Sequence, residues 1–278
     1  MIKRLYQKHP LILWGSILIF TLVFTALTAQ WIAPFDPIQQ NLGDHLLAPS
    51  WRHWMGTDQF GRDVFSRLLY GSRISLAVGL VAVTIYVSIG TLVGSLAGYY
   101  GRWVDGILMR FVDIMLSVPT FFLILMVIAF VGPNILNVMV IIGLTSWTDV
   151  ARLVRGEVLS LKEREFIQAA RVIGMGDARI ILKHLLPNAM GPILVVTTLG
   201  IGGSILVESS LSFLGLGVQP PTASWGNMLL EGKEHLTDAW WLVVFPGFAI
   251  FLTVMGFNLL GEGLRDMLDP RLRGSGRS

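Results

Sequence analysis

The sequence lacks cysteine altogether and carries few charged residues. The absence of cysteine excludes disulfide bonds, thiolate nucleophiles and cysteine-bound metal clusters. Only 14% of the 278 residues are charged, whereas a soluble domain carries roughly a quarter. Hydrophobic residues make up 53% of the chain, and the mean hydropathy is +0.66. The composition therefore argues against a soluble globular fold and predicts an integral membrane protein.

Six runs of sequence are apolar enough to cross a bilayer as helices. A hydrocarbon core about 30 Å thick needs about 20 apolar residues at 1.5 Å rise per residue. The first run follows three basic residues but is too long for the apolar region of a secretory signal, so we expect an uncleaved anchor. The predicted spans are residues 11–33, 76–98, 107–131, 135–150, 189–217 and 240–261. The predicted fold class is therefore all-α, a polytopic membrane protein with six transmembrane helices.

Lysine and arginine are distributed unequally between the two sides of this predicted bundle. Positively charged loops resist translocation, so the side that is richer in them is cytoplasmic. With the N-terminus inside, that side holds the basic residues of segments 1–10, 99–110, 151–187 and 262–278. The other side holds Arg52, Arg62, Arg67, Arg73 and Lys233. Both termini are therefore predicted to be cytoplasmic, and the net charge of +3 reflects this topology rather than a nucleic-acid partner.

The fifth span is the most polar of the six and is the best candidate for a translocation pathway. An ionised glutamate at membrane depth costs a few kcal/mol, so Glu208 is expected to face a watery cavity, a partner or the interface. A position near the outer surface is the alternative for Glu208. Asn258 in the last span is a weaker candidate. The predicted pathway residues are Ser204, Glu208, Ser209, Ser212 and Asn258.

The second span carries a glycine at every fourth position, at Gly90, Gly94 and Gly98. Such a stripe lets another helix approach closely, and helices in lipid associate mainly through packing of this kind. Packing within the chain and an interface with another subunit both remain open.

The segment 34–73 is too polar to span, and part of it is expected to form a helix lying at the membrane interface. Apolar pairs and one ion pair four residues apart support this helix. His53, Asp58, Asp63 and Ser66 fall within the segment. Neither their order nor their spacing matches a nucleophile elbow or a zinc helix, so we predict neither an enzyme nor a metal site.

The cytoplasmic loop 151–187 has the pattern of two short helices. Ser160 and Glu163 fit a capping box, which predicts a helix that begins at Ser160 and runs to about Ile173. One face of this helix is apolar at the spacing i, i+3, i+4, i+7. The residues of this stripe are Phe166, Ala169, Ala170 and Ile173.

A glycine-containing turn separates the two predicted helices. Gly174 and Gly176 permit a sharp stop, Asp177 is a suitable N-cap for a second helix over residues 178–186, and Pro187 is expected to end it. Met175 would be exposed at the turn unless a partner covers it. A partner protein is therefore predicted, and a loop that only packs beneath its own bundle is the alternative.

The loop resembles the EAA loop of ABC importer permeases. Gln168-Ala-Ala-x3-Gly174, followed by Leu186 and Pro187, keeps the pattern of that loop. The family has Glu where this chain has Gln168, and often Ile where it has His184. Gln168 should preserve hydrogen bonding but loses a possible charge pair with the partner.

Further motifs are similar to those of the second permease of dipeptide, oligopeptide and nickel importers, and together they cover nearly the whole chain. They are Gly56-Thr-Asp-x-x-Gly-Arg-Asp-x-x-Ser-Arg67, Ser212-Phe-Leu-Gly-Leu-Gly217, Pro220-Pro221 with Trp225-Gly226, and Phe257-Asn-Leu-x-Gly261 near Leu268-Asp-Pro270. The resemblance implies the type I ABC importer permease fold. It also implies an anchor with an extracytoplasmic segment (1–75), a permease domain (76–262) and a cytoplasmic tail (263–278).

The resemblance also implies the assembly. This chain would form half of the pathway for di- or oligopeptides in a bacterial or archaeal cell membrane. Its partners would be a homologous permease, two ATPase subunits that bind ATP and magnesium, an external solute-binding protein and membrane lipid. No cofactor is expected on this chain. Residues implied to contact the ATPase are Phe166, Gln168, Ala169, Ala170, Gly174, Met175, Gly176, Asp177, Leu186 and Pro187.

Two alternatives to peptide import stay open at this point. The same assembly could import nickel or another chelated metal. A secondary transporter driven by an ion gradient belongs to a different class, and its usual feature, inverted repeats with broken helices, is not apparent in this sequence.

Overall fold

The computed structural model describes residues 10–268, and within that range it is helical apart from loops and one isolated bridge between Thr57 and Asp63. Five helical segments are long and apolar enough to cross a membrane. They are α2 (Pro10–Ile32), α3 (Val64–Tyr100), α6 with α7 (Ile135–Leu161), α9 with α10 (Asp177–Phe213) and α12 (Trp241–Leu268). The bent pair α4 (Arg102–Leu116) and α5 (Thr120–Val131) supplies a sixth crossing if it counts as one span. The predicted all-α, polytopic fold is confirmed.

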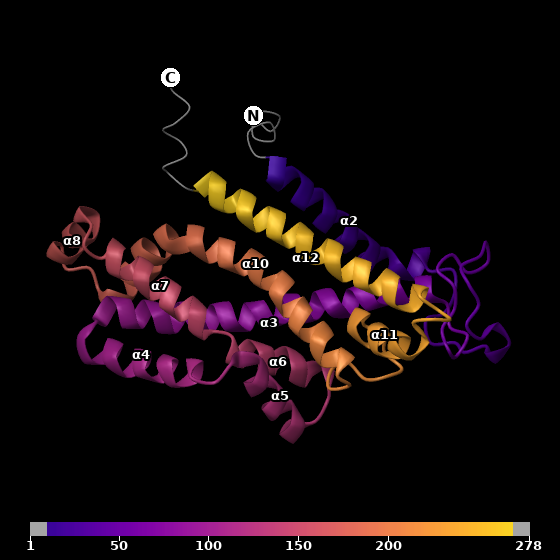
Figure 1. The fold of residues 1–278 in the computed structure, drawn as a ribbon. Helices are drawn as coiled ribbons and strands as arrows, with labels where there is room; N and C mark the ends of the chain where they lie inside the picture. The colour runs from indigo at the N-terminus through magenta and orange to yellow at the C-terminus, as the bar shows by residue number, and fades with distance from the viewer. Residues whose placement is uncertain (1–9, 269–278) are drawn as a thin grey trace.

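Helix α3 runs through the middle of the bundle, where it packs against α2, α6, α7 and α10 (Figure 1). Helix α12 lies along α2 and α10. A Cβ atom added to Gly263 would lie 2.5 Å from Ile12, and one added to Gly15 would lie 2.6 Å from the Leu260 nitrogen. The start of α2 and the end of α12 therefore lie at the same end of the bundle. The basic residues of 1–9, and the tail beyond Leu268, fall outside the described residues.

The predicted interfacial helix is wrong as a separate element, because residues 64–73 are the first turns of α3. Asp63 caps this helix by accepting a hydrogen bond from the Ser66 amide at 2.8 Å. Arg73, where a break was expected, donates from Nε to the Ala26 carbonyl of α2 at 2.6 Å. Because its guanidinium is bonded to backbone carbonyls of α2, nothing forces the chain to leave the helix between Arg73 and Leu76.

The predicted third span, residues 107–131, is not one straight helix. It divides into α4 and α5, which are bent by 79° relative to each other. The break contains Pro119, which is the N-cap of α5. The residue before a proline is pushed out of the α region, so α4 ends ahead of it. The fourth span is longer than the predicted residues 135–150. It consists of α6 (Ile135–Thr145) and α7 (Thr148–Leu161), which together continue past residue 150.

The glycine stripe of α3 packs within the chain, against α7. A Cβ atom added to Gly90 would lie 2.6 Å from Val150 Cβ, and one added to Gly98 would lie 2.9 Å from Val158 Cβ. Gly94 faces the Ala151 carbonyl in the same way. The stripe is therefore the contact surface of α3 for α7, which settles the question that the sequence left open.

Candidate functional site

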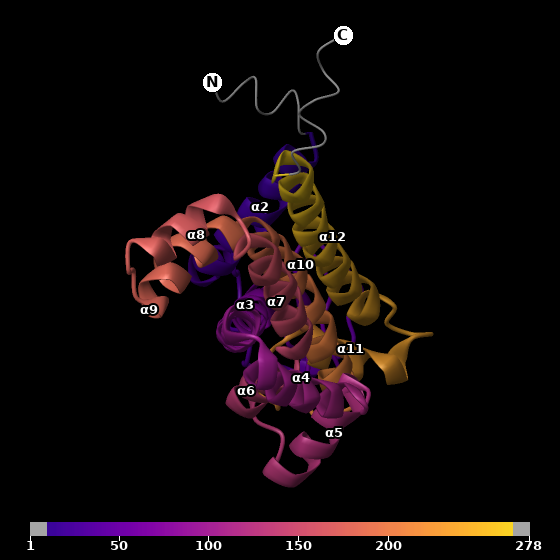
Figure 2. The ribbon, with the colours of Figure 1, turned by 90° about the vertical axis from the view of Figure 1, so that its left-hand side faces the viewer.

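The loop that the sequence marked as a partner-binding segment lies at one end of the bundle and projects from it (Figure 2). Its bounds are narrower than the predicted 151–187, because residues 151–161 belong to α7 and are packed on α3. Ser160 lies in the last turn of α7, so the predicted capping box is wrong. The first loop helix is α8 (Glu165–Val172), whose N-cap residue, Arg164, makes no side-chain cap. The connection outside the membrane-spanning helices therefore runs from Lys162 to Gly176.

The second predicted loop helix does not end at Pro187. It consists of α9 (Asp177–Ile180) and a π-helical segment, η2 (Ile181–Leu185), and it leads directly into α10 (Leu186–Phe213). Pro187 has no amide hydrogen and its ring crowds the carbonyl four residues earlier, which an ordinary α-helix does not tolerate. The π turn, in which the Leu186 amide donates to the Ile181 carbonyl, widens the helix at this point. Pro187 is therefore in the first turn of α10, and Asp177 is the first residue of α9 rather than its cap.

The turn between α8 and α9 has the conformation that its glycines predict. Gly174 has φ +76°, in the region that side chains other than glycine rarely adopt, and a Cβ atom added there would meet nothing within 4 Å. Gly176 is exposed, and Met175 is half-buried against the core.

Most of the predicted apolar stripe of α8 does not face the bundle. Of its four residues only Ala170 is buried, and it packs into the core cluster beneath the loop together with Ile167, which lay outside the predicted stripe. Phe166 remains 43% exposed and Ile173 76% exposed. The other predicted contact residues, Gln168, Ala169 and Pro187, are also exposed, and Leu186 is half-buried. Because large apolar side chains stay uncovered on a short, otherwise polar loop, this surface is suited to a protein partner.

The loop is tied to the ends of α3 and α7 by polar contacts. Tyr99 of α3 donates its hydroxyl to Asp177 Oδ1 at 2.6 Å. Lys162 Nζ donates to the Gly98 carbonyl at 3.2 Å. Gln168 Nε2 donates to the Lys162 carbonyl at 3.3 Å, a bond that the family's usual glutamate could not donate when ionised. The loop is therefore bonded to the end of α3 at two points.

Two of the predicted pathway residues border grooves on the membrane-spanning part of the chain. Ser204 lines a groove of about 370 Å³ together with Tyr86 and Asp149. Ser209 lines a more apolar groove of about 510 Å³ between α10, α11 (Trp225–Gly232) and α12. Asn258 is exposed on α12. Tyr86 and Asp149 were not predicted, because a single tyrosine or aspartate in a span carries no periodic signal that links it to Ser204.

Glu208 does not line an open path in this structure, but polar partners keep it from lipid, as the sequence predicted. The residue is 0% exposed, as is Ser75, with which it interacts. Glu208 Oε1 accepts hydrogen bonds from Ser212 at 2.7 Å and Ser224 at 3.1 Å. Its Oε2 lies 3.4 Å from the hydroxyls of Ser75 and Ser209. These five residues, which we call the Glu208 cluster, join α3, α10 and α11, so Ser212 also has a structural role here.

The outer side of the bundle contains a buried ion-pair network. Arg62 pairs with Asp58 at 2.6 Å, and both Arg62 and Arg67 donate to Glu231 Oε2 at 2.9 Å. The side chains of the two arginines are no more than 3% exposed. Because α11 supplies Glu231, the network fixes this outer helix to the start of α3.

The residues that might suggest catalysis are arranged as a helix cap. His53 Nδ1 lies 2.9 Å from Asp63 Oδ1, and Asp63 Oδ2 accepts from both the amide and the hydroxyl of Ser66. The serine thus contacts the carboxylate and not the imidazole, so no base activates it. Within residues 10–268, no three His, Asp or Glu side chains are grouped to hold a metal ion.

Comparison with known proteins agrees with this architecture. A family model described as "Binding-protein-dependent transport system inner membrane component" matches residues 90–274. A second model, "N-terminal TM domain of oligopeptide transport permease C", matches residues 2–49. The two matches together account for most of the chain and leave residues 50–89 between them.

Individual relatives and solved structures are also similar to this chain over most of its length. The dipeptide transport system permease protein DppC of Alkalihalophilus pseudofirmus is 45% identical over 267 residues, covering 96% of this chain and 88% of the relative. The glutathione transport system permease protein GsiD of Escherichia coli O6:K15:H31 is 46% identical over 272 residues, covering 98% and 90%. Inward-facing structures of the MetNI methionine ABC transporter match with a TM-score of 0.55 at 19% identity, over 71% of this chain and 96% of that one. A crystal structure of an amino acid ABC transporter with histidines matches with a TM-score of 0.56 at 16% identity, over 73% and 95%.

Proposed function

Because this chain belongs to the family of binding-protein-dependent transport system inner membrane components, we propose that it forms half of the translocation pathway of an ATP-driven importer of small peptides. The permease is a multi-pass protein of the inner membrane. A homologous permease would complete the pathway, two cytoplasmic ATPase subunits would bind ATP and magnesium, and an external binding protein would deliver the solute. The relatives named for dipeptide and for glutathione, a tripeptide, support small peptides as the substrate class.

The observation that carries the coupling role is the exposed apolar surface of the loop. Phe166, Ala169 and Ile173 present one face of α8 away from the bundle, and Gly174 turns the chain beside it. We propose that this face docks on an ATPase subunit. Since Tyr99 and Lys162 tie the loop to α3, closure of the ATPase dimer would move the spans and change which side of the membrane the pathway faces.

The test replaces Gly174 with valine in the complete importer. A β-branched residue at φ +76° is strained, by about 1–3 kcal/mol, so the turn should change shape although space is open around it. We expect the assembled complex to keep ATP hydrolysis but to lose most solute uptake in proteoliposomes. Gly156→Val on the exposed side of α7, where an added Cβ also meets nothing within 4 Å, is the matched control. Normal uptake by the Gly174 variant would refute the coupling role.

A further inference from the structure

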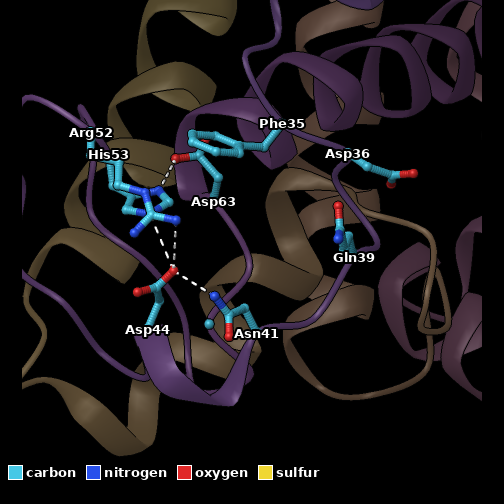
Figure 3. A pocket seen from close by; sticks show the side chains of 9 residues that line it. Phe35, Asp36, Gln39, Asn41, Asp44, Arg52, His53 and Asp63 are labelled. Carbon is cyan, nitrogen blue, oxygen red and sulfur yellow. Dashed lines mark hydrogen bonds and ion pairs between the residues drawn. The ribbon is translucent and has the colours of Figure 1, made fainter.

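A polar pocket lies in the segment between α2 and α3, at the end of the molecule opposite the loop helix α8 (Figure 1). Its volume is about 250 Å³, enough for a small polar group with water. Figure 3 shows the side chains that line it, with Asp44 and His53 facing each other across it. The predicted orientation of the chain places this pocket on the outer side of the membrane.

The pocket contains a buried histidine nitrogen without a hydrogen-bond partner. His53 is 3% exposed, and its Nε2 has no such partner among the described residues. Its Nδ1 lies 2.9 Å from Asp63 Oδ1. An ionised carboxylate can only accept, so Nδ1 carries the hydrogen of this bond. Nε2 is therefore the ring nitrogen that remains open to the pocket.

A carboxylate oxygen faces this nitrogen. Asp44 Oδ2 lies 3.7 Å from His53 Nε2, too far for a hydrogen bond. Asn41 Nδ2 donates to the same carboxylate oxygen at 2.8 Å. Arg52 reaches it only to 3.5 Å, and the arginine side chain is 66% exposed. The Asp44 carboxylate thus has Asn41 as a close donor but holds Arg52, its basic partner, only loosely, and Asp36 adds another carboxylate to the lining.

We propose that this pocket binds an ammonium group, which enters beside Asp44 by displacing the Arg52 guanidinium. An ammonium carries a positive charge and three donors, which match the Asp44 and Asp36 carboxylates and the other oxygens of the lining. A metal ion fits less well, because within the described range no three carboxylate or imidazole groups converge as ligands. The natural ammonium would come either from a peptide N-terminus or from a lysine of the binding protein.

The chain offers a clean chemical assay, because it has no cysteine of its own. Gln39→Cys places a thiol in the pocket lining, and Gln40→Cys places one on the next exposed residue, which is not among those that line the pocket. In the purified importer, each thiol is reacted with aminoethyl methanethiosulfonate and with its anionic sulfonatoethyl counterpart. We expect the cation-to-anion rate ratio at position 39 to exceed that at position 40 by about tenfold, because the carboxylates of Asp36 and Asp44 line the same pocket as residue 39.

Two further variants separate local charge from accessibility. Asp44→Asn removes the carboxylate that faces His53 and should bring the rate ratio at position 39 close to that at position 40. Arg52→Gln removes the loosely held guanidinium and should raise the ratio. If both variants leave the ratio unchanged, the pocket does not recognise the cation and the proposal is wrong.

Competition then tests binding itself. At pH 7.5, ethylammonium chloride should slow the modification of the Gln39→Cys thiol at least threefold more than sodium chloride of equal ionic strength, and should not affect Gln40→Cys. Equal effects of the two salts would overturn the proposal. Protection by a dipeptide alone, or by ligand-free binding protein alone, identifies the source of the ammonium. The result does not depend on coupling at Gly174, so the two proposals can fail separately.

Discussion

The contact between α3 and α7 makes a quantitative prediction for Gly90→Ala. The added methyl carbon would lie 2.6 Å from Val150 Cβ and 2.7 Å from the Trp147 carbonyl oxygen. Ordinary contact begins near 3.4 Å, so the two helices would have to separate by about 0.8 Å at this point. Such overpacking costs about 1–3 kcal/mol, and a backbone oxygen that cannot rotate away favours the upper part of that range.

A gain in helix propensity opposes this cost. Alanine stabilises a helix interior by about 0.5–1 kcal/mol relative to glycine. The net expectation is that Gly90→Ala lowers the free energy of unfolding by about 1–2 kcal/mol. Gly106→Ala on α4 is the matched control, because an added Cβ there meets nothing within 4 Å. This control should raise the free energy of unfolding by about 0.5–1 kcal/mol, since only the propensity gain remains.

The assay is unfolding of the purified protein from mild detergent by titration with sodium dodecyl sulfate, followed by tryptophan fluorescence. The two alanine variants should shift the midpoint in opposite directions relative to the unmodified chain. If Gly90→Ala stabilised the protein as much as Gly106→Ala does, the close approach of α3 and α7 would be refuted.

Three further predictions use the same preparation. Glu231→Gln removes one carboxylate from the buried guanidiniums of Arg62 and Arg67, and it should lower the free energy of unfolding by about 3–5 kcal/mol. The exposed Glu234→Gln should lower the free energy of unfolding by under about 0.5 kcal/mol. Tyr99→Phe removes the hydroxyl donated to Asp177 and should speed hydrogen exchange of the α9 amides by about tenfold, with exchange in α12 unchanged. Ser224→Ala removes both the N-cap of α11 and a donor to the Glu208 cluster, so it should lower stability by about 1–3 kcal/mol; a neutral result would refute the structural role of that cluster.

Most of the fold could be predicted because the bilayer imposes a simple rule on length and apolarity. The anchor α2 was placed within one residue at each end. The last span α12 begins within one residue of its predicted start but continues to Leu268, seven residues beyond the predicted end. The errors fall where polar residues or proline gave a local signal that tertiary contacts overrode. Arg73 was taken as a sign of a boundary, but its guanidinium is satisfied by the Ala26 carbonyl of α2, a contact between residues far apart in sequence.

In the candidate site, too, local backbone requirements could be predicted and contacts between distant residues could not. Gly174 was predicted correctly as the turn because a positive φ is a local requirement that glycine meets. The prediction that Pro187 ends a helix was wrong. A proline is tolerated where the helix widens around it, and the π turn at residues 181–185 that provides this widening has no recognisable sequence pattern. Glu208 was correctly expected to be kept from lipid, but its partners Ser75 and Ser224 lie far away in the sequence, so the cluster could not be inferred.

The contacts of α10 indicate how a movement of the loop would spread. At the loop end, Asp177 is bonded to Tyr99 of α3, and at the other end Glu208 is bonded to Ser75 of α3. On α3 the two attachment points are 24 residues apart, about 36 Å along a helix at 1.5 Å per residue. Helices joined at both ends and packed between them cannot slide past each other without breaking one attachment. A force on the loop should therefore move α3 and α10 together, and the change in shape should fall at the 79° bend between α4 and α5, where Pro119 interrupts the helix.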